Sequence, residues 1–423
     1  MSTLEDQTVW QHAVTALRRF VDRLEPGAYR EFSSWLLDEP HRADRWLQLN
    51  ALRAQIDMTN KLLSGLLDAD ETEAVAAHIA TYNVYLVQEV VSDNLAIGLA
   101  GRDHDDARSA LVQGFNTAMI TGLRDDGTRE ALRLLDELRP LTSGISLFEQ
   151  SLDEAEHRAL AASFAEAHPH IAPRAVEFDL HAALAAGVES CRAMTDSVSG
   201  LAVADLVRDG AAARYSAVTA LLRDRPTDTA RLLSLGTDSI LVVPTLAYYG
   251  GLVAEIARPT PGFPAVVADG LLHDATAEAA LAVRLLNDVG TGLLEHTPRQ
   301  RELVLEGTLA DCLLRAAATD SHLFTRLAKD IRFGEFNVCV DGIRDLPASR
   351  ESVAAFEQRL AELGHAYRSC RIALRDKLNA LTRCTGDDRL ATMISRFVEF
   401  HRHLYANPYD TTLGEYGIGR GQR

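Results

Sequence analysis

Cysteine, aromatic residues and long apolar runs are all scarce in this chain. Its five cysteines lie far apart and no two form a CxxC pair, which disfavours both a disulfide framework and a zinc site. The longest apolar run, Ile240–Tyr249, contains a proline and is far shorter than the roughly 20 residues that a membrane span needs. The N-terminus lacks the basic start and apolar stretch of a signal peptide. We therefore expect a cytoplasmic protein with no membrane span.

Positive charge is also in short supply. The 43 lysines and arginines are outnumbered by 60 acidic residues, which gives a formal net charge of −17. Because binding to nucleic acid depends on clustered lysine and arginine, this balance argues against a nucleic-acid partner. The hydrophobic fraction of 47% is typical of a folded globular protein and argues against disorder.

The apolar pattern predicts helices almost throughout. Apolar residues recur at intervals of three and four, as in the stripe formed by Phe356, Leu360, Leu363 and Tyr367. Prolines and glycines divide the pattern into segments, most clearly at 259–264. No repeat of fixed period is present. We predict an all-α fold, in which no proline- or serine-rich linker marks a boundary between domains.

A candidate metal site lies on one predicted helix, Asp274–His296. Asn287, Thr291 and Glu295 are spaced at i, i+4 and i+8, which places them on one face of a helix. Their amide, hydroxyl and carboxylate oxygens are hard donors of the kind that Mg²⁺ prefers, and Mg²⁺ commonly completes its shell with water and phosphate oxygens. No histidine or cysteine lies on that stripe, which disfavours zinc.

Two glycines inside this motif raise an alternative. Gly290 and Gly292 each cost about 1 kcal/mol in a helix interior, which favours a turn at 287–290 that closes the helix. The apolar stripe favours one continuous helix instead, because it passes through both glycines: Leu281, Leu285, Val289 and Leu293. We expect the continuous helix.

The segment from Asn287 to Glu295 resembles the NSE/DTE motif of class I terpene synthases, with threonine as the middle ligand. This resemblance implies that residues 140–423 form a class I terpenoid synthase helical bundle and that residues 1–139 are an N-terminal helical extension. It gives no account of residues 1–139 beyond that.

The family carries a second, aspartate-rich motif (DDxxD) upstream of the first. Glu149 and Asp153 stand at the first and last places of a degraded form of it, with Gln150 where a carboxylate is expected, and Glu149 lies 138 positions before Asn287. The resemblance implies that Glu149 and Asp153 hold further Mg²⁺ ions. The structural alternative is an acidic helix start, because acidic side chains favour the first turn of a helix.

The family also places an arginine upstream of the NSE motif, where it contacts the diphosphate. Arg231 resembles that residue, although its distance of 56 positions from Asn287 is longer than usual in the family, and a surface arginine is the alternative. Arg284 lies three positions before Asn287, on nearly the same helix face, and is a second candidate for reaching phosphate.

The C-terminal Arg-Tyr pair of the family is absent here. Glu415 precedes Tyr416 in its place, and Arg402 is a candidate substitute.

The function that the resemblance implies is that of a Mg²⁺-dependent lyase. Such an enzyme ionises a prenyl diphosphate by neutralising the charge of the leaving group, and it cyclises the carbocation to a terpene hydrocarbon or alcohol. We expect a substrate of C15 to C20 length, with geranylgeranyl diphosphate slightly favoured over farnesyl diphosphate. A homodimer is compatible with the sequence.

Three alternatives remain open. A squalene- or phytoene-type prenyltransferase would share the helical fold but needs DxxxD on both helices, which Asn287 and Thr291 do not match. A ferritin-like di-iron protein is suggested by ExxH at Glu154–His157 and Glu362–His365, a pattern expected by chance in so many glutamates and histidines. The third is a non-catalytic, all-helical adaptor or regulatory protein.

Overall fold

The computed structural model describes residues 4–96, 106–124, 127–148, 153–172, 174–223, 228–295, 303–319 and 321–406. Within these ranges the regular secondary structure is helical and no strand is present. One isolated antiparallel bridge joins Thr308 to Pro347. The prediction of an all-α fold is confirmed, whereas the terpenoid synthase bundle stays a prediction.

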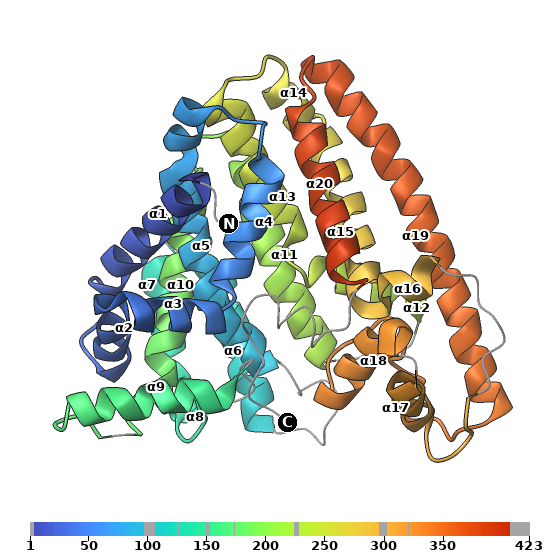
Figure 1. Ribbon diagram of the computed structural model, residues 1–423, viewed down its shortest axis with the longest axis horizontal. Coiled ribbons are helices and arrows are strands. Elements are labelled where there is room, and N and C mark those ends of the chain that lie inside the picture. The colour runs from blue at the N-terminus through green and yellow to red at the C-terminus, as the bar shows by residue number, and fades with distance from the viewer. Residues whose placement is uncertain are drawn as a thin grey trace. The chain divides into compact units, whose positions relative to one another are not determined.

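The chain divides into two compact units, each with its own core (Figure 1). The first contains the described residues of Met1–Ile97 and His104–Ala204. Its helices are α1 (Leu4–Val21), α2 (Ala28–Asp38), α3 (Pro40–Leu49), α4 (Leu52–Leu63), α5 (Ala69–Ala96), α6 (Asp106–Gly122), α7 (Thr128–Glu137), α8 (Arg139–Thr142), α9 (Glu154–Ala167) and α10 (Leu180–Asp196).

Helices α5 and α10 pack against each other and form the centre of the first unit. Helices α1 and α4 cover α5, whereas α7 and α2 contact α10, and α6 contacts both central helices. The core is built from large side chains that are fully buried, among them Tyr82, Tyr85, Phe32, Phe115 and Phe164. Burying side chains of this size supplies the main driving force for folding.

The second unit contains the described residues of Asp205–Thr412. Its helices are α11 (Ala204–Arg223), α12 (Thr229–Asp238), α13 (Val242–Gly251), the π-helix η1 (Leu252–Ala257), α14 (Phe263–Ala268), α15 (Leu271–Val289), α16 (Thr291–Glu295), α17 (Leu309–Thr319), α18 (Ser321–Phe333), α19 (Arg350–Thr385) and α20 (Arg389–Leu404).

Helix α15 is the central element of the second unit. It packs against α12, α13, α14, α18, α19 and α20, and in Figure 1 it lies beside α20 and the long α19. Its alanines and leucines are buried on several sides. The alanines are small, so the neighbouring helices can approach α15 closely. The N-cap of the long α19 is Ser349, whose side chain accepts a hydrogen bond from the Ser352 amide in a capping box.

The predicted division between residues 139 and 140 falls within α8, inside the first unit. The contacts instead separate the chain between Ala204 and Asp205, close to the start of α11. The boundary follows the short turn at 197–203 between α10 and α11, which is too brief to stand out in the sequence as a linker.

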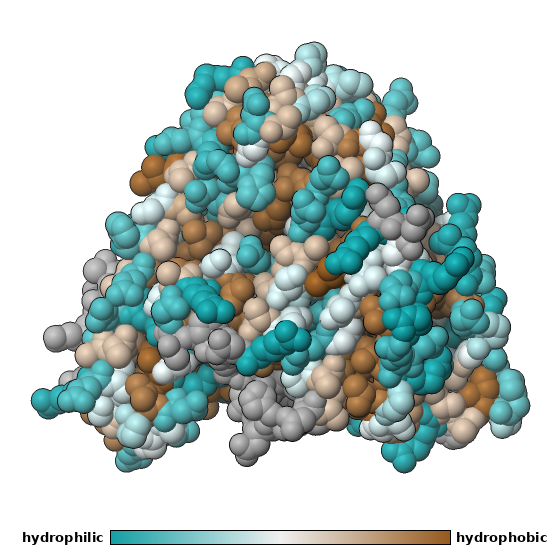
Figure 2. Space-filling view, turned by 180° about the vertical axis from the view of Figure 1, so that it is seen from behind, coloured by the Kyte–Doolittle hydropathy of each residue, from teal (hydrophilic) through white to brown (hydrophobic). Residues whose placement is uncertain are grey.

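One stretch of the described residues, Thr229–Ala257, is long and apolar enough to cross a membrane by length and composition alone. It comprises α12, α13 and η1, and 67% of its most apolar window is buried inside the protein. Burial of this kind is typical of the core helices of a bundle. On the face shown in Figure 2, hydrophilic residues cover much of the surface and hydrophobic residues lie between them.

Candidate functional site

The predicted metal motif is interrupted by a helix break. Helix α15 ends at Val289, and Gly290 adopts φ 86° and ψ 147°, a conformation that is almost restricted to glycine. A short new helix, α16, begins at Thr291. The expectation that Asp274–His296 forms one continuous helix is therefore wrong. The apolar stripe continued past Gly290 because α16 also buries its leucines, Leu293 and Leu294.

Thr291 is held by the C-terminal turn of α20. Its backbone N–H donates to the carbonyl of Tyr405 at 3.2 Å, and its hydroxyl donates to the carbonyl of Arg402 at 2.6 Å. The last carbonyls of a helix and the first N–H groups of another both lack partners within their own helices, so the two helix ends satisfy each other. These two hydrogen bonds hold the start of α16 against the end of α20, which explains why the chain turns at Gly290.

Asn287 lies before the break and contacts an arginine of α18. Arg326 donates from Nε to the backbone carbonyl of Asn287 at 2.9 Å and from Nη2 to its side-chain oxygen. The same guanidinium lies over the ring of Tyr405, 4.5 Å from its centroid. Arg326 thus links the predicted first metal ligand to the end of α20.

Glu295 contacts two further arginines. Nη1 of Arg402 lies 3.2 and 3.4 Å from its carboxylate oxygens, and Nη1 of Arg371 lies 3.7 Å away. Arg402 also donates to Glu399 at 2.7 Å, and the two carboxylates, Glu399 first, raise the pKa of Arg402. The arginine therefore stays fully charged beside Glu295.

These three donors suit Mg²⁺ by their chemistry but not by their present arrangement. The oxygens of Asn287 and Glu295 accept hydrogen bonds from guanidinium groups, and a divalent cation at the same oxygens would be repelled by those charges. Among the described residues, no group of three or more His, Cys, Asp or Glu side chains is placed to hold a metal ion. The three residues of the motif contact Arg326, Arg371 or the last turn of α20, which carries Arg402.

Arg284 and Asp288 lie on the buried side of α15. They form an ion pair, with the Arg284 side chain 7% exposed and Asp288 fully buried, and the Arg284 guanidinium lies over the ring of Phe336 at 5.4 Å from its centroid. Burial lowers the pKa of Arg284. The predicted phosphate-contacting role of Arg284 is untested, and in this structure its guanidinium balances the charge of Asp288.

Asp288 also fixes the segment that follows α18. Its Oδ2 accepts a hydrogen bond from the Val338 amide at 2.7 Å, and its carbonyl accepts one from Asn337 Nδ2 at 2.8 Å. Asn337 donates to Asp330 at 2.6 Å as well. We call these residues the buried ionic network of the second unit; it also contains Lys329, Glu335, Asp341 and Arg344.

The remaining predicted site residues are Glu149, Asp153 and Arg231. Glu149 lies outside the described residues. Asp153 is the N-cap of α9 in the first unit, where its side chain accepts a hydrogen bond from the Glu156 amide at 3.1 Å. Arg231 is exposed on the first turn of α12, where its amide is capped by Asp228. Asp153 thus has the capping geometry of the structural alternative.

The two ExxH pairs of the di-iron alternative lie in different units. His157 is buried, and its Nδ1 lies 3.0 Å from the carbonyl of Asp153, whereas Glu154 pairs with Arg158 at 2.6 Å. Glu362 and His365 are exposed on α19. Neither pair is joined by further ligands in the described residues.

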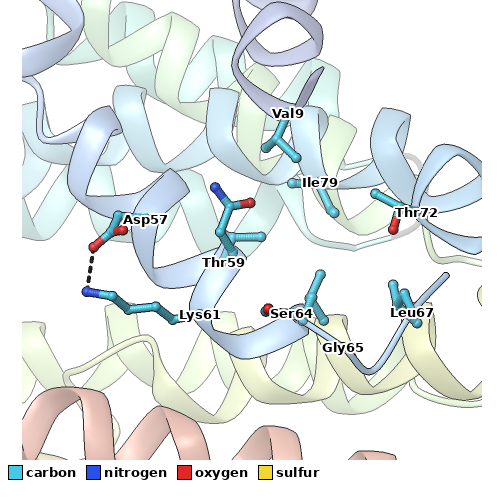
Figure 3. Close-up of a pocket in the computed structure, with 11 residues that line it drawn as sticks. Val9, Asp57, Thr59, Lys61, Ser64, Gly65, Leu67, Thr72 and Ile79 are labelled. Atoms are coloured by element: carbon cyan, nitrogen blue, oxygen red, sulfur yellow. Dashed lines mark ion pairs between the residues drawn. The ribbon is translucent and has the colours of Figure 1, made fainter. Parts of the chain in front are cut away.

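A separate hollow of about 220 Å³ lies in the first unit, between α1, the end of α4 and the start of α5 (Figure 3). Asp57 and Lys61 form an ion pair of 2.7 Å at one side, and Val9 and Ile79 close the other. Its volume is below the roughly 300 Å³ at which typical ligand pockets begin. No predicted site residue lines it.

Sequence reasoning missed Arg326 and Arg371 as neighbours of the motif. Arg326 lies 39 positions beyond Asn287, and Arg402, the candidate substitute for the C-terminal arginine, lies 107 positions beyond Glu295. No spacing rule links residues so far apart, since only the packing of α18, α19 and α20 on α15 and α16 brings them together.

The chain matches no family model, no curated protein and no solved structure.

Proposed function

We propose that the second unit binds a prenyl diphosphate beside α16 and ionises it, as a class I terpene synthase does. The observation that carries the proposal is the set of arginines at the motif: Arg326, Arg371 and Arg402 contact Asn287 or Glu295. Arginine binds phosphate oxygens through two parallel hydrogen bonds, so three of them near one point suit a diphosphate.

In the proposed reaction, the allylic C–O bond breaks heterolytically and the diphosphate leaves with the electron pair. The arginines stabilise the charge that develops on the leaving oxygen. Asn287, Thr291 and Glu295 are the residues that would hold Mg²⁺ if their present hydrogen bonds were exchanged for it, and the ion would supply further positive charge there. The carbocation then cyclises. It either loses a proton to give a hydrocarbon, or binds water and then loses a proton to give an alcohol. The substrate is of C15 to C20 length, with geranylgeranyl diphosphate slightly favoured over farnesyl diphosphate.

A second candidate is a non-catalytic, all-helical adaptor or regulatory protein. The same contacts favour it, because the side-chain oxygens of Asn287, Thr291 and Glu295 are each already bonded to protein groups. In that case the motif only joins α15, α16 and α20. This candidate has no need of Mg²⁺ or of a diphosphate.

Product analysis separates the two candidates. The full chain is incubated with geranyl, farnesyl and geranylgeranyl diphosphates plus Mg²⁺, and the extracts are analysed by gas chromatography. We expect a terpene from at least one substrate, and a loss on the order of 100-fold in Asn287→Ala and in Glu295→Ala. The matched control is Asp376→Asn on α19, an exposed carboxylate whose partner is also an arginine.

Helical circular dichroism shows whether each variant is folded. Formation of product by the control but not by the two motif variants supports the terpene synthase. The adaptor is favoured if no substrate yields product while the wild-type chain is fully folded. Product that persists in both motif variants removes the motif from the mechanism.

A further inference from the structure

We propose that the guanidinium groups of Arg371 and Arg402 and the hydroxyl of Tyr367 form an anion site that takes the diphosphate without a metal ion. In this structure the carboxylate of Glu295 occupies the site. The inference rests on the proposed function, because its ligand is the same diphosphate. It departs from that function in the metal, since the oxygens of the motif are bonded to protein groups and the arginines beside them suit an anion.

Arg371 of α19 and Arg402 of α20 converge on one carboxylate. Nη1 of Arg371 lies 3.7 Å from one oxygen of Glu295, and Nη1 of Arg402 lies 3.2 Å from the other. The side chains of Arg371 and Glu295 are 47% and 33% exposed, so an ion can reach them from the solvent. A diphosphate carries more negative charge than one carboxylate, and the two arginines therefore favour it in an exchange.

Tyr367 supplies a second, independent observation that points to a ligand. It lies one turn before Arg371 on α19 and is 2% exposed, and among the described residues its hydroxyl has no hydrogen-bond partner. A buried hydroxyl of this kind is unfavourable, because it has lost its hydrogen bonds to water and gained none in return. A bound oxyanion would supply the missing acceptor.

The Tyr367 hydroxyl lies close to the charges of the same site. Burial raises its pKa, and the charges of Arg371, Glu295 and Arg402 also act on it. The raised pKa keeps the hydroxyl protonated at neutral pH, so that it can donate a hydrogen bond to an anion. The Arg371 guanidinium also lies over the tyrosine ring, 5.6 Å from its centroid. The site thus gathers hydrogen-bond donors from two helices around one position.

Glu295 acts as an internal substitute for the anion. It is the last residue of α16 and is partly exposed, so its carboxylate can turn to the solvent and regain its hydration when the diphosphate takes its place. Arg402 remains positioned by Glu399, to which it donates at 2.7 Å. Only ionic contacts and hydrogen bonds are exchanged in this step, and no covalent bond forms or breaks.

Calorimetric titration of sodium pyrophosphate into the full chain, in EDTA and at constant ionic strength, tests the anion site. We expect the wild-type chain to bind pyrophosphate without a metal ion. Affinity should fall about tenfold in Tyr367→Phe and in Arg371→Gln, because each variant lacks a donor. It should rise about tenfold in Glu295→Gln, which removes the competing negative charge. The control is Arg375→Gln, an exposed arginine one turn beyond Arg371, which should bind as the wild type does.

Thermal unfolding of Tyr367→Phe separates binding from a structural role. Because the hydroxyl lacks a hydrogen-bond partner among the described residues, its removal should leave the Tm of the free chain unchanged or slightly higher. The rise in Tm caused by pyrophosphate in EDTA should be smaller in the variant than in the wild type. A lower Tm of the free variant together with an unchanged affinity for pyrophosphate would give the hydroxyl a structural role and overturn the site.

The outcomes separate the anion site from the proposed function. Binding of pyrophosphate that requires Mg²⁺ overturns the metal-free site and leaves the terpene synthase proposal standing. Equal affinity in the wild type, Glu295→Gln and Arg371→Gln also overturns it, because the anion then binds elsewhere. Metal-free binding in the expected order, in a chain that makes no terpene from any prenyl diphosphate, supports the anion site while the catalytic proposal fails.

Discussion

At the scale of single residues, Asp288 shows how the motif serves the fold. It is the residue after Asn287, it is fully buried, and it pairs with Arg284 on its own helix and with the amide of Val338 across the core. A buried carboxylate without such partners would be very unfavourable, so the neighbouring segment must hold its position. Asp288, the second residue of the NSE-like motif, therefore has a structural role in this arrangement.

The residue types of the site could be predicted, but their partners could not. The spacing of Asn287, Thr291 and Glu295 identified a place where polar side chains gather, and the structure places all three near the end of α20. The sequence could not show that arginines contact them, because Arg326 and Arg402 come from other helices. Spacing predicts which side chains share a face of one helix, and it carries no information on the helix opposite.

His401, on the last turn of α20, gives a prediction on pH. Its ring packs against Phe397 and Tyr405, its Nδ1 lies 2.8 Å from the Phe397 carbonyl, and burial lowers its pKa from 6.5 to about 4. Below pH 6.5 the unfolded chain binds a proton at His401 that the folded chain does not bind. Stability is therefore fully present above pH 6.5 and is lost as the pH falls towards 4.

Urea unfolding at pH 7 and pH 5 measures this contribution. The free energy of unfolding of the wild-type chain should fall between pH 7 and pH 5. From the pKa shift of His401, we expect this fall to be about 2 kcal/mol smaller in His401→Gln. The other titrating groups are common to both chains and cancel in the difference. An identical loss in the two proteins would show that His401 is not held in its neutral form.

At the scale of elements, the helical character of the chain could be predicted, whereas the break at Gly290 was wrongly resolved in favour of a continuous helix. Pro26 and Gly27 lie between α1 and α2. Residues 258–262 connect η1 to α14, so the predicted loop at 259–264 is present but ends two residues earlier, and Pro264 lies in the first turn of α14. Pro140 instead lies in the first turn of α8, where a proline is tolerated because its missing N–H has no partner there. At these positions a proline or glycine marks a helix end, but not which end.

Gly290 was ambiguous because two local signals disagreed. The glycines favoured a turn, and the apolar period favoured a continuous helix. The contact that decides between them lies outside the segment: the end of α20 offers its carbonyls to Thr291. In a continuous helix the Thr291 hydroxyl would donate to a carbonyl of the preceding turn, as Thr219 does to Tyr215. The break instead satisfies the ends of two helices together.

At the scale of the whole molecule, the three tryptophans provide a selective probe. Trp10, Trp35 and Trp46 all lie in the first unit, whereas the buried ionic network lies in the second. Tryptophan fluorescence therefore reports the unfolding of the first unit, and helical circular dichroism reports both. Two units with separate cores need not unfold in one transition.

Asp288→Asn tests this division. Removing one charge of a buried pair leaves Arg284 without its partner, which we expect to cost about 3 kcal/mol of stability in the second unit. The urea midpoint followed by circular dichroism should then fall by more than the midpoint followed by fluorescence. Asp376→Asn, on the surface, should change the free energy of unfolding derived from either probe by less than about 0.5 kcal/mol. Equal shifts of both probes in Asp288→Asn would show that the chain unfolds as one unit.

The most direct test of this account is the stability of Gly290→Ala. A Cβ at this position would meet Arg326 Cγ at 3.4 Å, an ordinary contact, so the effect of the substitution comes from the backbone. At φ 86° we expect alanine to lower the free energy of unfolding by about 1 to 3 kcal/mol, measured by urea titration. An increase of about 1 kcal/mol, the value for glycine to alanine inside a helix, would mean that α15 continues through Gly290 and that α20 does not hold Thr291 in this way.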